Sequence, residues 1–196
     1  MNLVDRVKNI IMTPKTEWPV IAAEEANPTA ILTGYVIPLA AVPAVATVIG
    51  TGLIGGPFGA SLTFGIGTGI VTFITAVVGV YLTALVMDYL APNFGSQKNF
   101  GRALQTVAYS YTPAWVGGIL AILPAISWLG TLAGLYGLYL MYLGLPHTMK
   151  TPEDKTIVYM IVTIIVLVVI YSILALILGG IMVAILGFGA MGSMMQ

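Results

Sequence analysis

The sequence predicts an all-α polytopic membrane protein. Of its 196 residues, 59% are hydrophobic and 7% are charged, whereas an average soluble domain has about 25% charged residues. The mean hydropathy is +1.02. Five apolar segments are long enough to cross a bilayer as helices, and none shows the two-residue alternation of a barrel strand. This composition excludes a soluble enzyme, a nucleic-acid-binding protein and a disordered chain.

The segment before the first span, residues 1–29, is predicted to lie in the cytoplasm. Residues 2–11 predict a short amphipathic helix, because four apolar residues recur at helical spacing: Leu3, Val7, Ile10 and Ile11. We expect this helix to lie on the membrane surface, with the ring of Trp18 as an interfacial anchor. It would serve either as a lead-in to the first span or as a docking helix for a partner.

The five apolar segments are predicted to be membrane spans, since a helix needs about 20 mostly apolar residues to cross a hydrocarbon core of about 30 Å. They cover about 30–50, 62–90, 103–123, 128–145 and 156–186. Together they form a five-helix transmembrane domain over residues 30–190, which a short tail at 191–196 follows. Prolines predict kinks at Pro38 and Pro43 in the first span and at Pro113 in the third.

The positive charges predict the orientation of these spans. All Lys and Arg residues fall in three segments that a five-span topology places on one side of the membrane: Arg6, Lys8, Lys15, Lys98, Arg102, Lys150 and Lys155. Cytoplasmic loops carry an excess of Lys and Arg. We therefore expect a membrane protein with its N-terminus in the cytoplasm and its C-terminus outside.

Small residues predict how the spans pack. Stripes of glycine run along one face of the second span and of the fourth span: Gly65, Gly69, Gly79, Gly130, Gly134 and Gly137. Glycine lets helix backbones approach closely inside a membrane. The stripes predict packing within one bundle, and the alternative is an interface between copies of the chain in a homo-oligomer.

The third span is predicted to have a polar face. Its members recur at spacings of three and four residues: Arg102, Gln105, Thr106, Tyr109, Ser110 and Thr112. Polar groups inside a bilayer must face protein or water. This face would either line a cavity or pathway for an ion, a lipid head group or a small solute, or form hydrogen bonds between helices. Asp88, near the end of the second span, is expected to pair with Arg102 or Lys98.

No catalytic constellation is visible in the sequence. There is no cysteine, one histidine, and no set of nucleophile, base and acid. Equal numbers of acidic and basic residues give no net charge that would attract nucleic acid. We therefore expect a protein that is not an enzyme and has no metal or cofactor. Its expected partners are the lipid bilayer and, as alternatives, a second copy, another membrane protein or a cytoplasmic protein.

An ordered series of short motifs resembles the Yip domain family (Ypt/Rab-interacting membrane proteins) in its short prokaryotic form. It begins with Pro14, Trp18 and Ile37-Pro38-Leu39, continues with Phe100-Gly101-Arg102 and Tyr109-Ser110-Tyr111-Thr112-Pro113, and ends with Ile122-Leu123-Pro124 and Thr151-Pro152-Glu153-Asp154-Lys155. The resemblance implies a five-helix membrane domain with a cytoplasmic N-terminus. It also implies a link to Rab-type GTPases, vesicle budding and membrane shaping in eukaryotic members. Those members have a long cytoplasmic region before the first span, where this chain has about 29 residues, so the resemblance leaves GTPase binding open. The short prokaryotic form implies a prokaryotic cytoplasmic membrane as the location.

Two functions are therefore expected. The first is a non-enzymatic membrane-organising or scaffold protein of the Yip type, which acts through helix packing and its cytoplasmic face. The second is a small channel or transporter for ions or small solutes, in which the polar face of the third span and Asp88 line the path. No convincing internal repeat of the transporter type is visible in the sequence.

Overall fold

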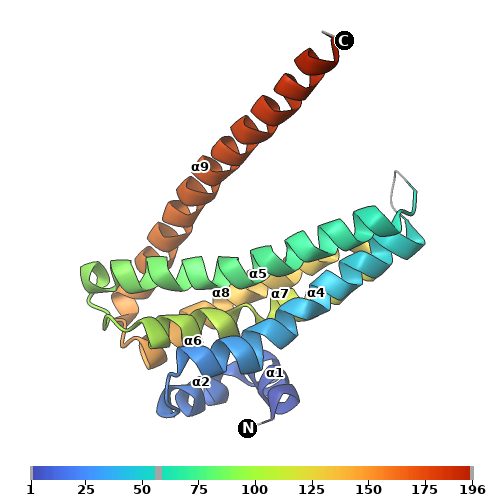
Figure 1. Ribbon diagram of the computed structural model, residues 1–196. Helices are drawn as coiled ribbons and strands as arrows, with labels where there is room; N and C mark the ends of the chain where they lie inside the picture. The colour runs from blue at the N-terminus through green and yellow to red at the C-terminus, as the bar shows by residue number, and fades with distance from the viewer. Residues whose placement is uncertain (1, 56–58, 195–196) are drawn as a thin grey trace.

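The computed structural model describes residues 2–55 and 59–194, with side chains described as far as residue 176. The regular secondary structure of these residues is helical, as predicted. Four helical stretches are long and apolar enough to cross a membrane: Pro28–Ile54, Leu62–Phe94, Leu129–Thr148 and Glu153–Leu176. Figure 1 shows most of the chain as a bundle of roughly parallel and antiparallel helices, from which the last helix projects.

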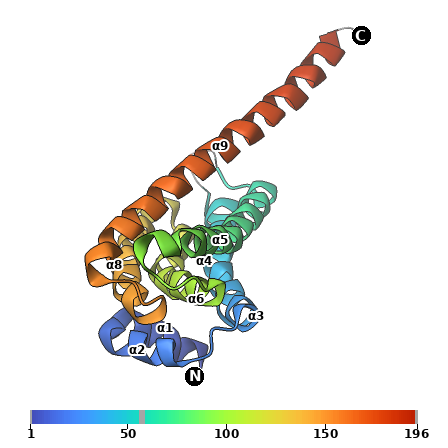
Figure 2. The same ribbon diagram turned by 90° about the vertical axis from the view of Figure 1, so that its left-hand side faces the viewer.

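The chain begins with two short helices, α1 (Leu3–Met12) and α2 (Pro14–Ala23), here called the N-terminal helix pair. They lie along one side of the bundle, beneath α6 and α8 in Figure 2. Ile10, Trp18 and Ile21 are fully buried. The predicted amphipathic helix therefore exists as α1, but its apolar face packs on protein. The prediction that Trp18 anchors at the membrane surface is wrong, because this side chain has no exposed area.

The first predicted span is one helical stretch with two π-helical segments. It runs through α3 (Pro28–Ile31), η1 (Leu32–Val36), α4 (Ile37–Ile49) and η2 (Gly50–Ile54). Pro38, in the first turn of α4, has no N–H to donate, and the wider π turn before it accommodates the missing bond. Pro43 lies inside α4 and packs against Gly118, where an added Cβ would stand 2.6 Å from the Cβ of Pro43.

The second predicted span is α5 (Leu62–Leu90), which continues as the 3-10 helix η3 (Ala91–Phe94). It packs along α4. Glycines make this contact close: a Cβ at Gly65 would stand 2.5 Å from the Cα of Gly52, and a Cβ at Gly69 would overlap Val48. Gly65 and Gly69 therefore pack helices within one chain, as the glycine stripe predicted.

The third predicted span is a broken helix. It consists of α6 (Phe100–Ser110), α7 (Thr112–Gly117), η4 (Gly118–Ile122) and η5 (Pro124–Ile126). Pro113 lies in the first turn of α7, where its ring cannot continue the hydrogen bonding of α6. None of the four pieces alone reaches the length of a span. The expected kink near Pro113 therefore appears as an interruption at Tyr111 between α6 and α7, so the predicted span 103–123 is not one continuous helix.

The fourth and fifth predicted spans are α8 (Leu129–Thr148) and α9 (Glu153–Met194). α8 packs on α6 and α7. Its glycines divide into two kinds: Gly130 and Gly137 touch the α7 and α6 backbones, whereas a Cβ at Gly134 would meet nothing within 4 Å. The prediction that Gly134 serves helix packing is therefore wrong in this chain.

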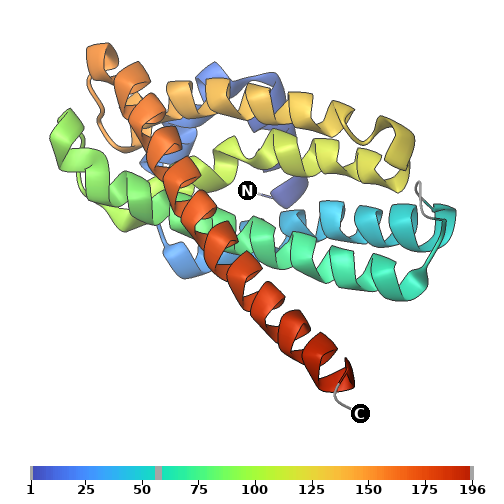
Figure 3. The ribbon, with the colours of Figure 1, turned by 90° about the horizontal axis from the view of Figure 1, so that it is seen from above.

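Helix α9 leaves the bundle at an oblique angle, as Figures 1 and 3 show. It contacts α5 and α8 near its beginning. A Cβ added at Gly79 of α5 would stand 3.2 Å from the hydroxyl of Tyr171. Leu167 is the last buried side chain among those described in this helix. The helix runs past the predicted end at 186, and residues 195–196 of the predicted tail lie outside the described residues.

Candidate functional site

The polar residues predicted for the third span lie inside the protein. Gln105, Thr106, Ser110 and Thr112 have 0–1% of their area exposed, and Tyr109 has 7%. All but Thr112 belong to α6, which Asn99 caps by accepting a hydrogen bond from the N–H of Arg102. We call Arg102, Gln105, Thr106, Tyr109, Ser110 and Thr112 the α6 polar face. Its burial means that its function depends on which groups it contacts.

The first turns of the α6 polar face bond to the N-terminal helix pair. Arg102 Nη1 donates to the carbonyl of Glu24 and to Oε1 of Gln105, both at 2.9 Å. Gln105 Nε2 donates to the carbonyl of Ile21 at 3.1 Å. The carbonyls of Ile21 and Glu24 stand at the end of α2, where the helix provides no donor four residues further on, although Ile21 also accepts from the N–H of Glu24. Arg102 and Gln105 therefore close the C-terminal end of α2.

The later turns of this face bond to α8 and to the first span. The hydroxyls of Thr106 and Thr148 are 2.5 Å apart, which joins α6 to α8. The hydroxyls of Thr112 and Tyr35 are 2.6 Å apart, which joins the start of α7 to η1. Apart from Ser110, each hydroxyl or amide of this face whose bonds are described is satisfied by protein. The face thus forms hydrogen bonds between elements.

A buried ion-pair cluster of Arg6, Glu17 and Glu24, which the sequence patterns did not predict, lies beside this face. Arg6 pairs with Glu17 at 2.6 Å and also with Glu24, and its guanidinium lies 5.4 Å from the centre of the Tyr109 ring. Arg6 and Glu17 are 4–5% exposed. A signal was present: Arg6 is three residues after Leu3 and four before Ile10, so it shares their buried face.

Aromatic rings fill the space around Tyr109. Its ring packs edge-on against Tyr35, with centroids 4.5 Å apart, and against Trp18 at 6.4 Å. Trp18 in turn lies against Gly144 of α8, where an added Cβ would stand 2.7 Å from the indole ring. Arg6, Trp18, Tyr35 and Tyr109 therefore hold the helix pair against three other elements.

Asp88 does not make the expected ion pair. Among the described residues, the salt bridges found both belong to Arg6, and Arg102 is turned toward Glu24 and Gln105. Asp88 is half-buried near the end of α5, and its Oδ1 has no hydrogen-bond partner in the described part of the chain. The prediction of an Asp88–Arg102 or Asp88–Lys98 pair is therefore wrong.

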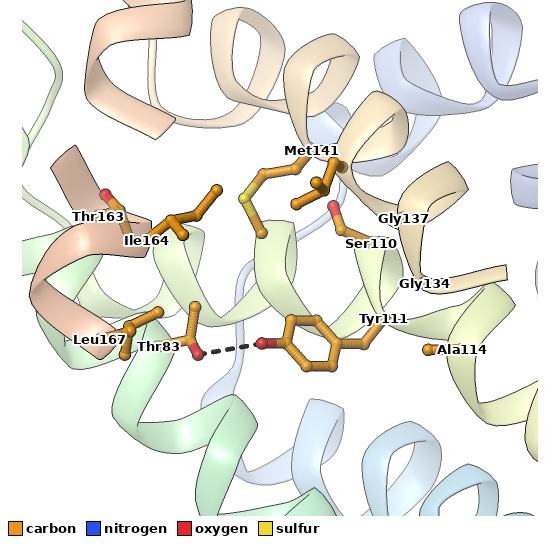
Figure 4. Close-up of a pocket in the computed structure, with 11 residues that line it drawn as sticks. Thr83, Ser110, Tyr111, Ala114, Gly134, Gly137, Met141, Thr163, Ile164 and Leu167 are labelled. Carbon is orange, nitrogen blue, oxygen red and sulfur yellow. Dashed lines mark hydrogen bonds between the residues drawn. The ribbon is translucent and has the colours of Figure 1, made fainter. Parts of the chain in front are cut away.

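Two cavities adjoin the α6 polar face. One of about 320 Å³ is polar and lies between the helix pair and the first span, where Arg6, Glu24, Tyr35 and Gln105 line it. The other, of about 260 Å³, is mainly apolar and lies between α5, α6, α7, α8 and α9 (Figure 4). Within the described residues, no group of three or more His, Cys, Asp or Glu side chains could hold a metal ion.

Comparison with known proteins assigns this arrangement to a family. The model of the Yip1 domain family matches residues 8–194, which is nearly the whole chain. The chain belongs to the Yip1 domain family. It is a Yip1-domain membrane protein, and the resemblance seen in its short motifs is confirmed.

The curated relatives of this Yip1-domain chain are bacterial. The inner membrane protein YohC of Escherichia coli K12 is 26% identical over 162 residues, which cover 78% of this chain and 83% of YohC. YohC of E. coli O6:H1 matches to the same extent. No solved structure matches the chain.

Proposed function

We propose that this Yip1-domain protein is a non-enzymatic membrane-organising or scaffold protein. The observation that supports the proposal most is the use of the α6 polar face. Its amide, its guanidinium and its threonine hydroxyls bond to α2, η1 and α8, and so they fix the N-terminal helix pair on the bundle. The result is a rigid surface of α1 and α2 that a membrane or another protein can contact.

We also propose that the protein lies in the bacterial inner membrane with its N-terminus in the cytoplasm. The name of the relative YohC supports the membrane. The orientation is supported by contacts among the three positively charged segments. The N–H of Gln97 donates to the carbonyl of Met149, Ser96 bonds to Thr151, and Arg102 bonds to Glu24. The positive segments therefore meet at one end of the bundle, as cytoplasmic segments do.

The orientation is testable because the chain has no cysteine. Single cysteines at Lys15, Lys150 and Ser61 would be labelled with a membrane-impermeant maleimide in intact spheroplasts and again after lysis. We expect Ser61→Cys to react in intact cells and the other two only after lysis. Labelling of Lys15→Cys or Lys150→Cys in intact cells would reverse the proposed orientation.

Transport is the second candidate, and Asp88 is the observation that favours it. A carboxylate oxygen without a partner inside a membrane helix is the kind of group that binds a cation or proton. Against it, the rest of the predicted pathway is occupied by hydrogen bonds between helices. The scaffold proposal accounts for more of the polar residues.

Purified protein in proteoliposomes tests both candidates in one preparation. Ion and proton flux would be measured beside vesicle diameter, with empty liposomes as the reference and Asp88→Asn as the matched variant. We expect no flux above the reference and a change of vesicle size or shape that Asp88→Asn retains. Flux that Asp88→Asn abolishes, with vesicles unchanged, would replace the scaffold proposal by transport.

A further inference from the structure

The apolar cavity beside α6 has features that helix packing does not require. It is bounded by five helices and measures about 260 Å³. A water molecule has a share of about 30 Å³ in the liquid, so the space holds roughly nine groups of that size. Its lining residues come from α5, α6, α7, α8 and α9: Thr83, Ser110, Ala114, Gly134, Met141 and Leu167 are among them. Figure 4 shows these side chains around a common space.

Gly134 is the residue that keeps this space open on the α8 side. A Cβ at this position would meet no atom within 4 Å, in contrast to Gly130 and Gly137 on the same helix. In a close helix contact, the neighbouring helix occupies the space that a side chain would need. This is the case at Gly137, where a Cβ would stand 2.6 Å from the carbonyl of Ser110. Gly134 therefore leaves room for an occupant that is not part of the described chain.

Two hydroxyl groups at the cavity lack the bonds that other helical hydroxyls make. Ser110 and Thr163 are each 1% exposed, and neither hydroxyl has a hydrogen-bond partner among the described residues. Elsewhere in the bundle, threonines such as Thr83 and Thr148 bond the carbonyl one turn earlier. In Figure 4 the Ser110 hydroxyl points from α6 toward Met141, across the cavity from α9. A buried hydroxyl without a partner is an available donor for a ligand.

The position of the cavity identifies the source of its occupant. Ser110 and Thr163 each lie ten residues from the beginning of their helix, which is about 15 Å along the bundle. Ile164 and Leu167 line the cavity from α9, and no described side chain of α9 beyond Leu167 is buried. Figure 3 shows that α9 then leaves the other helices. An occupant would enter from the surrounding lipid between these diverging helices, and most of its contacts would be apolar.

We propose that this cavity binds the ester end of a membrane lipid acyl chain. The methylene groups would fill the apolar part beside Met141, Ile164 and Leu167, and the ester carbonyl would accept a hydrogen bond from Ser110 or Thr163. An ester carbonyl is an acceptor without a proton to donate, which suits two hydroxyls that need acceptors. The site is independent of whether the protein organises membranes or transports solutes.

Photolabelling tests the proposal on the full chain, purified in dodecyl maltoside, a detergent without a carbonyl group. The probe is a fatty acid methyl ester that carries a diazirine, and labelled residues are located by mass spectrometry. Methyl octanoate and decane, similar in size, compete for the site. We expect labels at Leu138, Met141 and Ile164, and competition by methyl octanoate at a concentration roughly two- to tenfold lower than by decane.

Three variants separate the contributions of the cavity. Ser110→Ala breaks no described hydrogen bond and should reduce the advantage of methyl octanoate over decane. Gly134→Leu should fill the cavity and remove the labelling, whereas Gly67→Leu, which adds the same side chain to an exposed site on α5, should retain it. Labelling that persists in folded Gly134→Leu, or equal competition by the two compounds in the unmodified protein, would overturn the proposal. If Gly134→Leu does not fold, Ser110→Ala decides the result.

Discussion

The indole ring of Trp18 lies directly against Gly144, with space for no side chain between them. A Cβ at position 144 would stand 2.7 Å from two ring atoms. Trp18 has no exposed area. This contact therefore fixes where α2 sits on α8, and the helix pair depends on it.

Gly144→Ala should loosen this contact. The added methyl group must displace the indole ring, and we expect the free energy of unfolding to fall by about 1–3 kcal/mol. The measurements are the melting temperature in detergent and the emission maximum of Trp18 in a Trp115→Phe, Trp128→Phe background, which should shift to longer wavelength. Gly134→Ala on the same helix is the control, because its Cβ meets open space. Equal melting temperatures for the two variants would contradict the contact.

Arg6→Met should detach the N-terminal helix pair. It leaves the Glu17 carboxylate buried without its partner, and removal of one member of a buried pair costs about 3–5 kcal/mol. Limited proteolysis within residues 12–27 should become faster, and the melting temperature should fall. Lys8→Met is the matched control, since Lys8 is exposed on the same helix. Equal proteolysis rates for both variants would show that the ion pair does not hold the helix pair in place.

Gly65→Leu should separate α4 from α5. A Cβ at Gly65 would stand 2.5 Å from the Cα of Gly52, so no rotamer of leucine fits without moving a helix. We expect a lower melting temperature and a larger aggregated fraction in size-exclusion chromatography. Gly67→Leu lies two residues away on the exposed side of the same helix and should behave like the unmodified protein. An effect of Gly67→Leu as large as that of Gly65→Leu would instead indicate an interface between copies.

Tyr35→Phe should cost less, because it removes one hydrogen bond and keeps the ring. The Tyr35 hydroxyl is 2.6 Å from that of Thr112, and a typical bond contributes about 0.5–1.5 kcal/mol to the free energy of unfolding. Chemical or thermal unfolding in detergent measures the change. Tyr89→Phe, at a tyrosine that is 75% exposed, provides the reference. No difference between the two variants would mean that the Tyr35–Thr112 bond adds nothing to stability.

The sequence was sufficient for the helical class and for the bounds of α5. α5 begins and ends at the predicted residues 62 and 90, because Ser61 caps it and an uninterrupted apolar run follows. The glycine contacts at Gly65, Gly69, Gly130 and Gly137 were likewise predicted, since small residues at a spacing of four have few other uses in a membrane helix. Local pattern decides these features.

The errors have one physical origin, which is contact between distant segments. Trp18 and Arg6 were assigned to the membrane surface because an amphipathic helix before a span usually lies there. The neighbouring sequence does not show that Trp18 packs on Gly144 and Arg6 on the ring of Tyr109, because each partner lies more than a hundred residues further along the chain. Nearness in sequence predicts a pair between Asp88 and Arg102, yet Arg102 instead donates to the carbonyl of Glu24 at the end of α2. Gly134 has the same spacing as Gly130 and Gly137, but no other described segment packs against it.

The bond between Tyr136 and the carbonyl of Ile11 joins residues 125 positions apart. A ribosome adds about 5–20 residues per second, so the N-terminal helices exist for roughly 6–25 s before α8 has been synthesised. During that interval Ile10, Trp18 and Ile21 have no permanent site to occupy. Arg6, Glu17 and Glu24 come from this early segment alone, and they can neutralise one another before docking. The N-terminal helix pair can therefore form its internal ion pairs during synthesis, before α6 and α8, the helices on which it packs, have been made.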